Sequence, residues 1–248
     1  MAHVLFILTA AEQLPLLDGN HIATGFWAQE FVPAHHLFLE HGHQISIATP
    51  KGKPAVLDEH CFAPEFHHHD MGRIANLREQ LNEIEAWRTP LSLERLALTG
   101  AKFDAVFFPG GHGPMVDLIA SEAAGTLVKR TLANQGLIGA ICHGPAGLIC
   151  AQHDGKWLLA DYQLTCFSPA EEQLAGLATQ LPELLADRLA QLGGQLSFAD
   201  AGQENVVIDR QLYTGQNPAS VDKLAYHLAR KLKKMGSLDK DACVTPCD

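Results

Sequence analysis

Residues 136–147 read Gly-Leu-Ile-Gly-Ala-Ile-Cys-His-Gly-Pro-Ala-Gly, an apolar run that ends at Cys142. The run is typical of a buried strand, and the His, Gly and Pro after it suit a sharp turn into a helix. Such a turn presents its residue at the carboxyl edge of a sheet, near a helix N-terminus that favours a thiolate. The stretch therefore predicts a nucleophilic Cys142. The alternative is a buried cysteine that merely ends a core strand, which is the commoner role of a lone Cys.

Strand-like and helix-like segments alternate on both sides of this stretch, which predicts an α/β fold with a doubly wound, mostly parallel sheet sandwiched by helices. We expect one domain over 1–235 and a polar tail over 236–248, with a small lid insertion at about 50–100, where a long polar segment precedes a helix. Strands are expected near 4–9, 45–48, 103–108, 137–141, 162–167, 196–198, 206–208 and 212–214, and helices near 25–41, 74–87, 116–119, 123–134, 184–192 and 217–233.

Composition narrows the class of protein. The chain has 248 residues, is 47% hydrophobic and carries a formal net charge of −10, so nucleic acid is not an expected partner. No apolar run approaches ~18 residues, and the first strand-like segment lacks a positively charged flank, so neither a membrane span nor a signal peptide is predicted. The six cysteines follow no framework spacing, which favours free thiols and a reducing, cytoplasmic location; Cys243 and Cys247 lie in the tail.

Several groups near other strand ends complement a thiol. The turn Gly110-Gly111 and the N–H of His143 are candidate donors for an oxyanion hole. The turn has neither the dinucleotide-binding nor the phosphate-loop spacing, so no cofactor is predicted. His143 is a candidate base, although adjacent side chains often point apart. Its carboxylate partner is Glu171 or Glu172, unless these are simply first-turn helix acids. Glu30 is a further candidate acid, against a solvated position on a helix face.

The segment 60–70 is rich in metal-ligand residue types, including His67-His68-His69-Asp70. Contiguous histidines cannot all face one ion, and no recognised ligand spacing is present. We therefore predict a solvated loop and no metal site.

Four motifs together resemble the ThiJ/PfpI superfamily, which is related to class I glutamine amidotransferase domains, and most of all its glyoxalase III and stress-chaperone-like branch. They are Phe108–Gly113 (Phe-Pro-Gly-Gly-His-Gly), Ala140–Ala146 (Ala-Ile-Cys-His-Gly-Pro-Ala), Thr165–Glu172 (Thr-Cys-Phe-Ser-Pro-Ala-Glu-Glu) and Thr214–Ser220 (Thr-Gly-Gln-Asn-Pro-Ala-Ser). The likeness extends to about Lys234. It implies a flavodoxin-like sandwich and a homodimer.

The resemblance also implies a chemistry. Cys142 becomes the nucleophile of a Cys-His-acid triad with His143 and Glu172, and Glu30 becomes a buried acid that contacts the thiol. The implied activity is glyoxalase III (D-lactate dehydratase): glutathione-independent conversion of methylglyoxal and related small 2-oxoaldehydes to D-lactate-type acids through a Cys142 hemithioacetal, without a cofactor. The alternatives are a holdase chaperone, a protein deglycase, a cysteine peptidase or amidase, and a redox sensor whose thiol oxidises readily.

Overall fold

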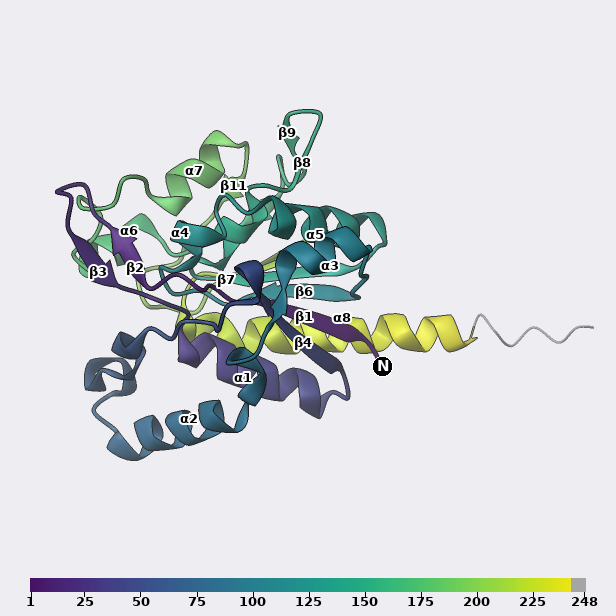
Figure 1. Cartoon of the computed structure of the whole chain (residues 1–248), viewed down its shortest axis with the longest axis horizontal. Coiled ribbons are helices and arrows are strands. Elements are labelled where there is room, and N and C mark those ends of the chain that lie inside the picture. The colour runs from purple at the N-terminus through teal and green to yellow at the C-terminus, as the bar shows by residue number, and fades with distance from the viewer. Residues whose placement is uncertain (242–248) are drawn as a thin grey trace, which may run out of the picture.

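A seven-stranded sheet forms the centre of the computed structural model, which describes residues 1–241, with side chains as far as Met235 (Figure 1). The strand order is β12-β13-β7-β6-β1-β4-β5, and every neighbouring pair is parallel except β12 with β13. The expected mostly parallel sheet is confirmed. Its strands are β1 His3–Ile7, β4 Gln44–Thr49, β5 Leu91–Ser92, β6 Ala105–Phe108, β7 Leu137–Ile141, β12 Val206–Asp209 and β13 Leu212–Gly215.

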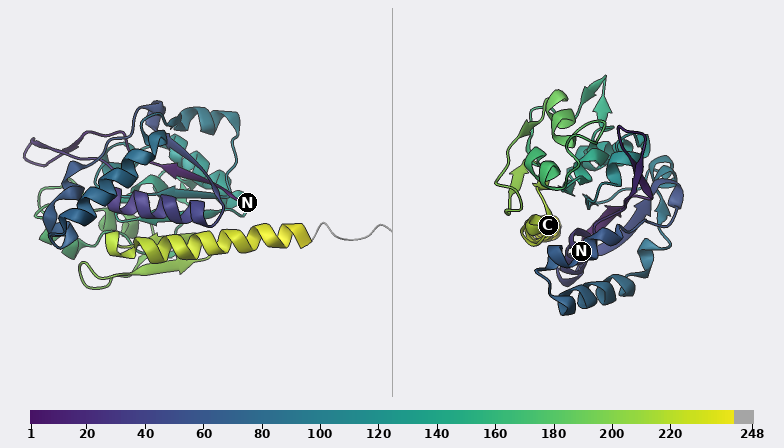
Figure 2. Two further views of the ribbon diagram at one scale, coloured as in Figure 1. Left: turned by 90° about the horizontal axis from the view of Figure 1, so that it is seen from below. Right: turned by 90° about the vertical axis from the view of Figure 1, so that its left-hand side faces the viewer.

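Helices cover both faces of the sheet, as Figures 1 and 2 show. On one face α1 and α8 run side by side with α2 beyond them, and on the other lie α3, α5 and α7. Along β1 the side chains alternate between the faces, because successive residues of a strand point to opposite sides: Val4 and Phe6 join the first core, Leu5 and Ile7 the second. The helices are α1 Ala28–Glu40, α2 Met71–Glu83, α3 Leu93–Thr99, α4 Pro114–Asp117, α5 Glu122–Ala133, α6 Pro169–Leu174, α7 Leu185–Gln191 and α8 Val221–Asp241.

Three pairs of very short strands lie outside the central sheet. They are β2 Gln13–Pro15 with β3 His21–Ala23, β8 Gln152–His153 with β9 Lys156–Trp157, and β10 Gln163–Leu164 with β11 Gln195–Leu196. The expected strand at 162–167 is therefore mostly wrong. After Leu164 the chain leaves the strand and crosses the end of β7, where the Phe167 N–H donates to the carbonyl of Cys142 at 2.9 Å.

Two predicted boundaries also differ from the structure. The lid segment at 50–100 contains α2, as expected, but it ends in β5 and α3, which belong to the central sheet and its covering layer. Helix α8 continues to Asp241, so the backbone of 236–241, assigned to the tail, is helical. Cys243 and Cys247 lie outside the described residues. Among the helices of residues 1–241, none has the length and apolarity required to cross a bilayer.

Candidate active site

Cys142 lies immediately after β7, at the carboxyl edge of the sheet. Its φ of 59° is in the left-handed region, which costs a non-glycine residue roughly 1–2 kcal/mol. The turn is held because the Cys142 N–H donates to the carbonyl of Gly215 at 2.9 Å, at the end of β13. A 3-10 helix, Gly144–Leu148, follows at once. Strained backbone of this kind is typical of functional sites, and the predicted strand-turn-helix geometry is confirmed.

The Cys142 thiol is protonated at rest, whereas the sequence suggested a thiolate. Only 5% of the residue is exposed, and burial raises the pKa of the thiol well above its usual range. The nearby carboxyl of Glu30 raises the pKa further, while the N–H of Gly111 acts in the opposite direction. The short 3-10 helix does not outweigh burial. Reaction at this sulfur therefore needs a base that removes its proton.

His143 is placed to be that base. Its Nδ1 lies 3.4 Å from Cys142 Sγ, so these adjacent side chains do meet. Its Nε2 lies 2.6 Å from Glu172 Oε1, in the first turn of α6. Burial and then the neighbouring His112 lower the pKa of His143 to about 4, so its ring is neutral at neutral pH. Burial favours the neutral form of Glu172, but hydrogen bonds from His112 and His143 prevail and hold its pKa below the usual range. At neutral pH the three groups are thus a protonated thiol on Cys142, a neutral imidazole on His143 and a carboxylate on Glu172.

Glu30, in the first turn of α1, also lies next to Cys142. Its Oε2 accepts the N–H of Gly110 at 2.7 Å, and its buried Oε1 has no hydrogen-bond partner. Burial raises the pKa of the Glu30 carboxyl to about 8, although the Gly110 and Cys142 contacts act to lower it. At neutral pH the carboxyl is therefore mostly protonated and offers a proton beside Cys142.

The glycine turn after β6 is shaped by close approach. A Cβ on Gly110 would lie 2.6 Å from the Cβ of Cys142 and 2.7 Å from a Glu30 oxygen, so only glycine fits between them. Gly111 has a φ of 87°, which glycine adopts without strain. The Gly110 N–H was expected to donate to an oxyanion, but in the structure it donates to Glu30 Oε2. The N–H groups of Gly111 and His143 remain the candidate donors.

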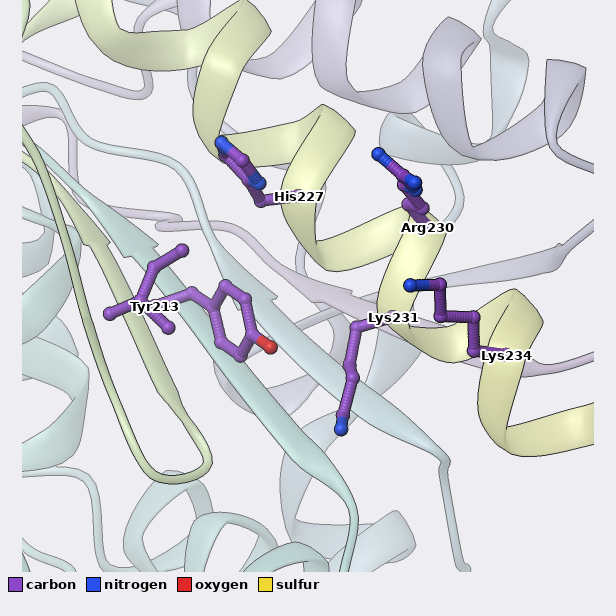
Figure 3. A pocket seen from close by; sticks show the side chains of 6 residues that line it. Tyr213, His227, Arg230, Lys231 and Lys234 are labelled. Carbon is purple, nitrogen blue, oxygen red and sulfur yellow. The ribbon is translucent and has the colours of Figure 1, made fainter. Parts of the chain in front are cut away.

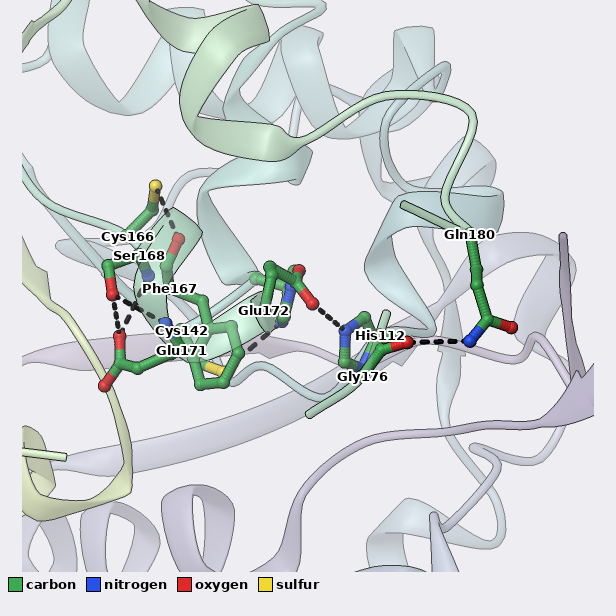
Figure 4. Close-up of polar contacts among 10 residues, drawn as sticks. His112, Cys142, Cys166, Phe167, Ser168, Glu171, Glu172, Gly176 and Gln180 are labelled. Carbon is green, nitrogen blue, oxygen red and sulfur yellow. Dashed lines mark hydrogen bonds and ion pairs between the residues drawn. The ribbon is translucent and has the colours of Figure 1, made fainter. Parts of the chain in front are cut away.

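Glu171 and Glu172 are adjacent in α6 but their side chains contact different residues (Figure 4). Glu171 forms a capping box with Ser168 and accepts the side-chain N–H groups of Gln216 at 3.1 Å and Asn217 at 2.7 Å. It therefore fastens the start of α6 to the loop after β13. Glu172 points the other way, to His143. The preference for Glu172 as the acid partner agrees with this geometry.

We expect Glu171→Ala to destabilise the fold by about 2–4 kcal/mol, because it removes the acceptor of the buried Ser168 N–H and hydroxyl and one of the two acceptors of each amide of Gln216 and Asn217. Urea unfolding measures the loss. Glu122→Ala is the matched control, since Glu122 is also a first-turn helix acid but is exposed, and its removal should cost less than about 0.5 kcal/mol. Equal losses in the two variants would contradict the assigned role of Glu171.

His112 was missed as a site residue, although it lies in the glycine-rich motif after β6. Its Nε2 is 3.1 Å from Glu172 Oε2, and its ring stacks on that of His143 with centroids 3.9 Å apart. Potential metal-binding atoms of His112, His143 and Glu172 lie within 4.8 Å of one another, but the carboxylate already accepts both imidazoles. The His-rich segment does not join this cluster: His67 is buried, and its Nε2 is 2.8 Å from the carbonyl oxygen of Cys61.

A basic hollow of about 270 Å³ lies elsewhere, between α8 and β13 (Figure 3). Tyr213, His227, Arg230 and Lys231 are among its lining residues. None of the candidate catalytic side chains reaches it, so the hollow is separate from the Cys142 site.

Comparisons with known proteins agree with the fold and with the motifs. Residues 22–197 match the family described as ThiJ/PfpI family-like. The chain is 30% identical over 219 residues to the glutamine amidotransferase-like class 1 domain-containing protein 1 of Homo sapiens, covering 85% of this chain and 92% of that protein. It is 28% identical over 240 residues to the protein/nucleic acid deglycase HchA of Pseudomonas aeruginosa (strain LESB58), covering 92% of this chain and 80% of the relative.

Solved structures show the same architecture. The Rapid Encystment Protein 24 kDa (REP24) of Francisella tularensis has a TM-score of 0.78 and 29% identity, covering 94% of this chain and 99% of that chain. Glyoxalase III of Candida albicans also has a TM-score of 0.78, at 21% identity, and covers 92% of this chain and 96% of its own. This second likeness concerns the fold alone.

Proposed function

This chain belongs to the ThiJ/PfpI family, and from that premise we propose that it is a glutathione-independent glyoxalase that converts small 2-oxoaldehydes to 2-hydroxy acids. The observation that carries the proposal is the position of Cys142 between two groups with different proton states. His143 can accept a proton, and Glu30 holds one. Conversion of a 2-oxoaldehyde needs a nucleophile and a carrier that moves a proton between adjacent carbons, and this arrangement supplies both.

The first step forms a hemithioacetal. The Nδ1 of His143 takes the thiol proton as Cys142 Sγ bonds to the aldehyde carbon, and Glu172 stabilises the imidazolium that results. Glu30 donates its proton to the aldehyde oxygen, so that oxygen becomes a hydroxyl and Glu30 becomes a carboxylate. The N–H groups of Gly111 and His143 are the donors that would stabilise negative charge on the same oxygen.

The second step moves hydrogen from C1 to C2. The Glu30 carboxylate removes the C1 proton, and the imidazolium of His143 protonates the C2 oxygen, which gives an enediol. Glu30 then returns its proton to C2 while the C1 hydroxyl loses a proton to His143, which leaves a thioester to Cys142. At this point Glu30 is a carboxylate and His143 is an imidazolium, so Glu30 deprotonates the water that attacks the thioester carbon, and His143 protonates the departing sulfur. The C–S bond breaks, the thiol recovers a proton and the 2-hydroxy acid leaves.

The depth of the thiol favours a small substrate over a peptide. Cys142 is 5% exposed, and the ring of Phe167 packs on His143 with centroids 4.9 Å apart. A three-carbon aldehyde needs much less room at the sulfur than an extended chain does. We therefore favour a reaction with a small aldehyde over the hydrolysis of a peptide or an amide.

The proposal is tested by supplying methylglyoxal without glutathione and measuring lactate, with its configuration read by stereospecific lactate dehydrogenases. We expect D-lactate in an amount equal to the methylglyoxal consumed. Loss of the aldehyde without lactate would show simple adduct formation and would contradict the proposal.

Protein deglycase is the second candidate, because relatives at 28–29% identity over most of this chain bear that name. The same thiol would attack the carbon that joins methylglyoxal to an amine or guanidine. The two functions are separated with a purified adduct from which free aldehyde is continuously removed. A deglycase releases the amine under this condition, whereas the proposed glyoxalase does not.

The pH dependence follows from the two proton states. Neutral His143 is required, so kcat/KM should fall as the pH drops through its pKa of about 4. Protonated Glu30 is required, so kcat/KM should also fall as the pH rises through about 8. When lactate formation is measured from pH 3.5 to 9.5 and corrected for the reaction without enzyme, kcat/KM plotted against pH should be bell-shaped. A rate that keeps rising beyond pH 9 would show that thiol ionisation, not Glu30, limits the reaction.

A further inference from the structure

Both oxygens of the Glu172 carboxylate are engaged by imidazoles. His143 Nε2 is 2.6 Å from Oε1. His112 Nε2 is 3.1 Å from Oε2, the contact drawn between these two residues in Figure 4. The Glu172 side chain is only 3% exposed, so water competes little for either oxygen. We propose that His112 is a positioning residue of the reaction: by holding Glu172 Oε2 it fixes the carboxylate, and through the carboxylate it sets the orientation and basicity of His143.

The hydrogen bonds determine where the protons are. An ionised carboxylate only accepts, so each Nε2 that contacts Glu172 carries a hydrogen. In neutral His143 this leaves the lone pair on Nδ1, which lies 3.4 Å from Cys142 Sγ. The nitrogen that faces the thiol is therefore the one able to accept its proton. If Oε2 lost its donor, the carboxylate would be free to turn about its terminal bond, and the imidazole that depends on it would lose its fixed orientation.

His112 also limits how readily His143 takes a second proton. The two ring centroids are 3.9 Å apart at an interplanar angle of 38°. Two imidazolium charges at this separation would repel each other, so both rings are not charged together at low cost. The negative charge of Glu172 is shared between two imidazole donors. It therefore stabilises a protonated His143 ring less than it would if His143 were its only partner. Burial and His112 thus keep His143 neutral, in the form that can act as a base.

Three carboxyl groups interact electrostatically with His112 or His143. Glu172 and Glu171, both on α6, raise the pKa of His143. On the lid side, Asp58 interacts electrostatically with His112 and is itself nearly buried. His112 is 16% exposed in its side chain and so forms the outer end of the network, between the lid segment and the buried thiol.

Two substitutions separate positioning from packing. His112→Phe keeps a ring against His143 but removes the donor to Glu172, whereas His112→Gln keeps an N–H donor and removes the ring. The readouts are the rate of Cys142 alkylation by iodoacetamide as a function of pH, followed by peptide mass spectrometry, and the NMR titration of the His143 ring. His153→Phe is the matched control, because His153 is exposed and lies on β8, outside the network.

In His112→Phe we expect alkylation to slow by about tenfold, and its acid limb and the His143 titration to move up by about one pH unit. The reason is that Glu172 then supports His143 alone and the repulsion from His112 is gone. His153→Phe should keep the wild-type limb, and His112→Gln, which keeps the donor to Glu172 but loses the repulsion, should keep the alkylation rate within about threefold of wild type and move the limb by less than His112→Phe does. A wild-type profile in His112→Phe, or a larger defect in His112→Gln than in His112→Phe, would overturn the proposal.

The inference rests on the proposed function only in taking Cys142 as the nucleophile. Alkylation needs no aldehyde, so absence of lactate formation and absence of the His112 effect are separate results. If iodoacetamide does not reach the sulfur, the NMR titration decides alone: an unchanged His143 titration in His112→Phe overturns the proposal.

Discussion

Cys142→Ala should abolish lactate formation from methylglyoxal, with kcat/KM reduced by at least about 10³-fold, or roughly 4 kcal/mol of transition-state stabilisation. Without the sulfur no hemithioacetal forms, and neither His143 nor Glu30 can create one. The substitution keeps the backbone turn, since alanine accepts a φ of 59° at about the same cost as cysteine does. The loss should therefore reflect chemistry. Circular dichroism and the midpoint of urea unfolding check that the variant is folded.

Cys166→Ala is the matched control for this experiment. Cys166 is also buried, and burial raises the pKa of its thiol, so it is as unreactive as a structural cysteine should be. Its Sγ donates to the carbonyl of Phe167, away from His143. We expect lactate formation in Cys166→Ala within about threefold of wild type. Full activity in Cys142→Ala would contradict the mechanism, and equal losses in both variants would point to a packing defect.

The sequence was sufficient for the parts of the fold that depend on local pattern. The apolar run at Leu137–Ile141 matches β7 residue for residue, because a strand buried on both faces needs an uninterrupted apolar segment. The run at 162–167 looks equally strand-like. Only Gln163–Leu164 is a strand, because the residues after Leu164 cross over β7 and the Phe167 N–H donates to the carbonyl of Cys142. Long-range contacts of this kind leave no periodic signal.

The site residues that could be predicted are those whose residue type is unusual in a sequence motif. Those whose role depends on the direction of a side chain in the fold could not be predicted. Cys142 and His143 followed from the turn motif. The choice of Glu172 over Glu171 needed the family resemblance, because both residues lie in one helical turn and only their rotation about α6 separates them. His112 was missed because a histidine in a glycine-rich turn carries no spacing signal. The electrostatics of the thiol were also unpredictable, since burial is a property of the whole fold.

Glu30→Gln should reduce lactate formation by about 10²–10⁴-fold while leaving the sulfur able to react. Glutamine preserves shape, and its carbonyl can accept the N–H of Gly110 as Glu30 Oε2 does, but it cannot carry a proton from C1 to C2. Alkylation of Cys142 should therefore continue at a rate close to wild type. This pairing of a reactive thiol with a lost conversion distinguishes a proton carrier from a residue that merely shapes the turn. A variant that keeps most of its lactate formation would exclude Glu30 from the proton transfer.

The same substitution makes a prediction about stability, with a sign that follows from burial. The pKa of Glu30 is about 8 in the folded protein against an ordinary value of 4.5, so the folded state holds this proton more tightly than the unfolded chain does. The wild type thus has the full stability from this group below about pH 4.5 and loses it progressively as the pH rises to about 8. Glu30→Gln has no such loss, so urea unfolding should show it gaining on the wild type between pH 5 and 8, by an amount on the order of a few kcal/mol. In the proposed mechanism Glu30 transfers this proton, which would account for a carboxyl that lowers stability near neutral pH. A pH-independent difference between the two proteins would contradict the raised pKa on which that role depends.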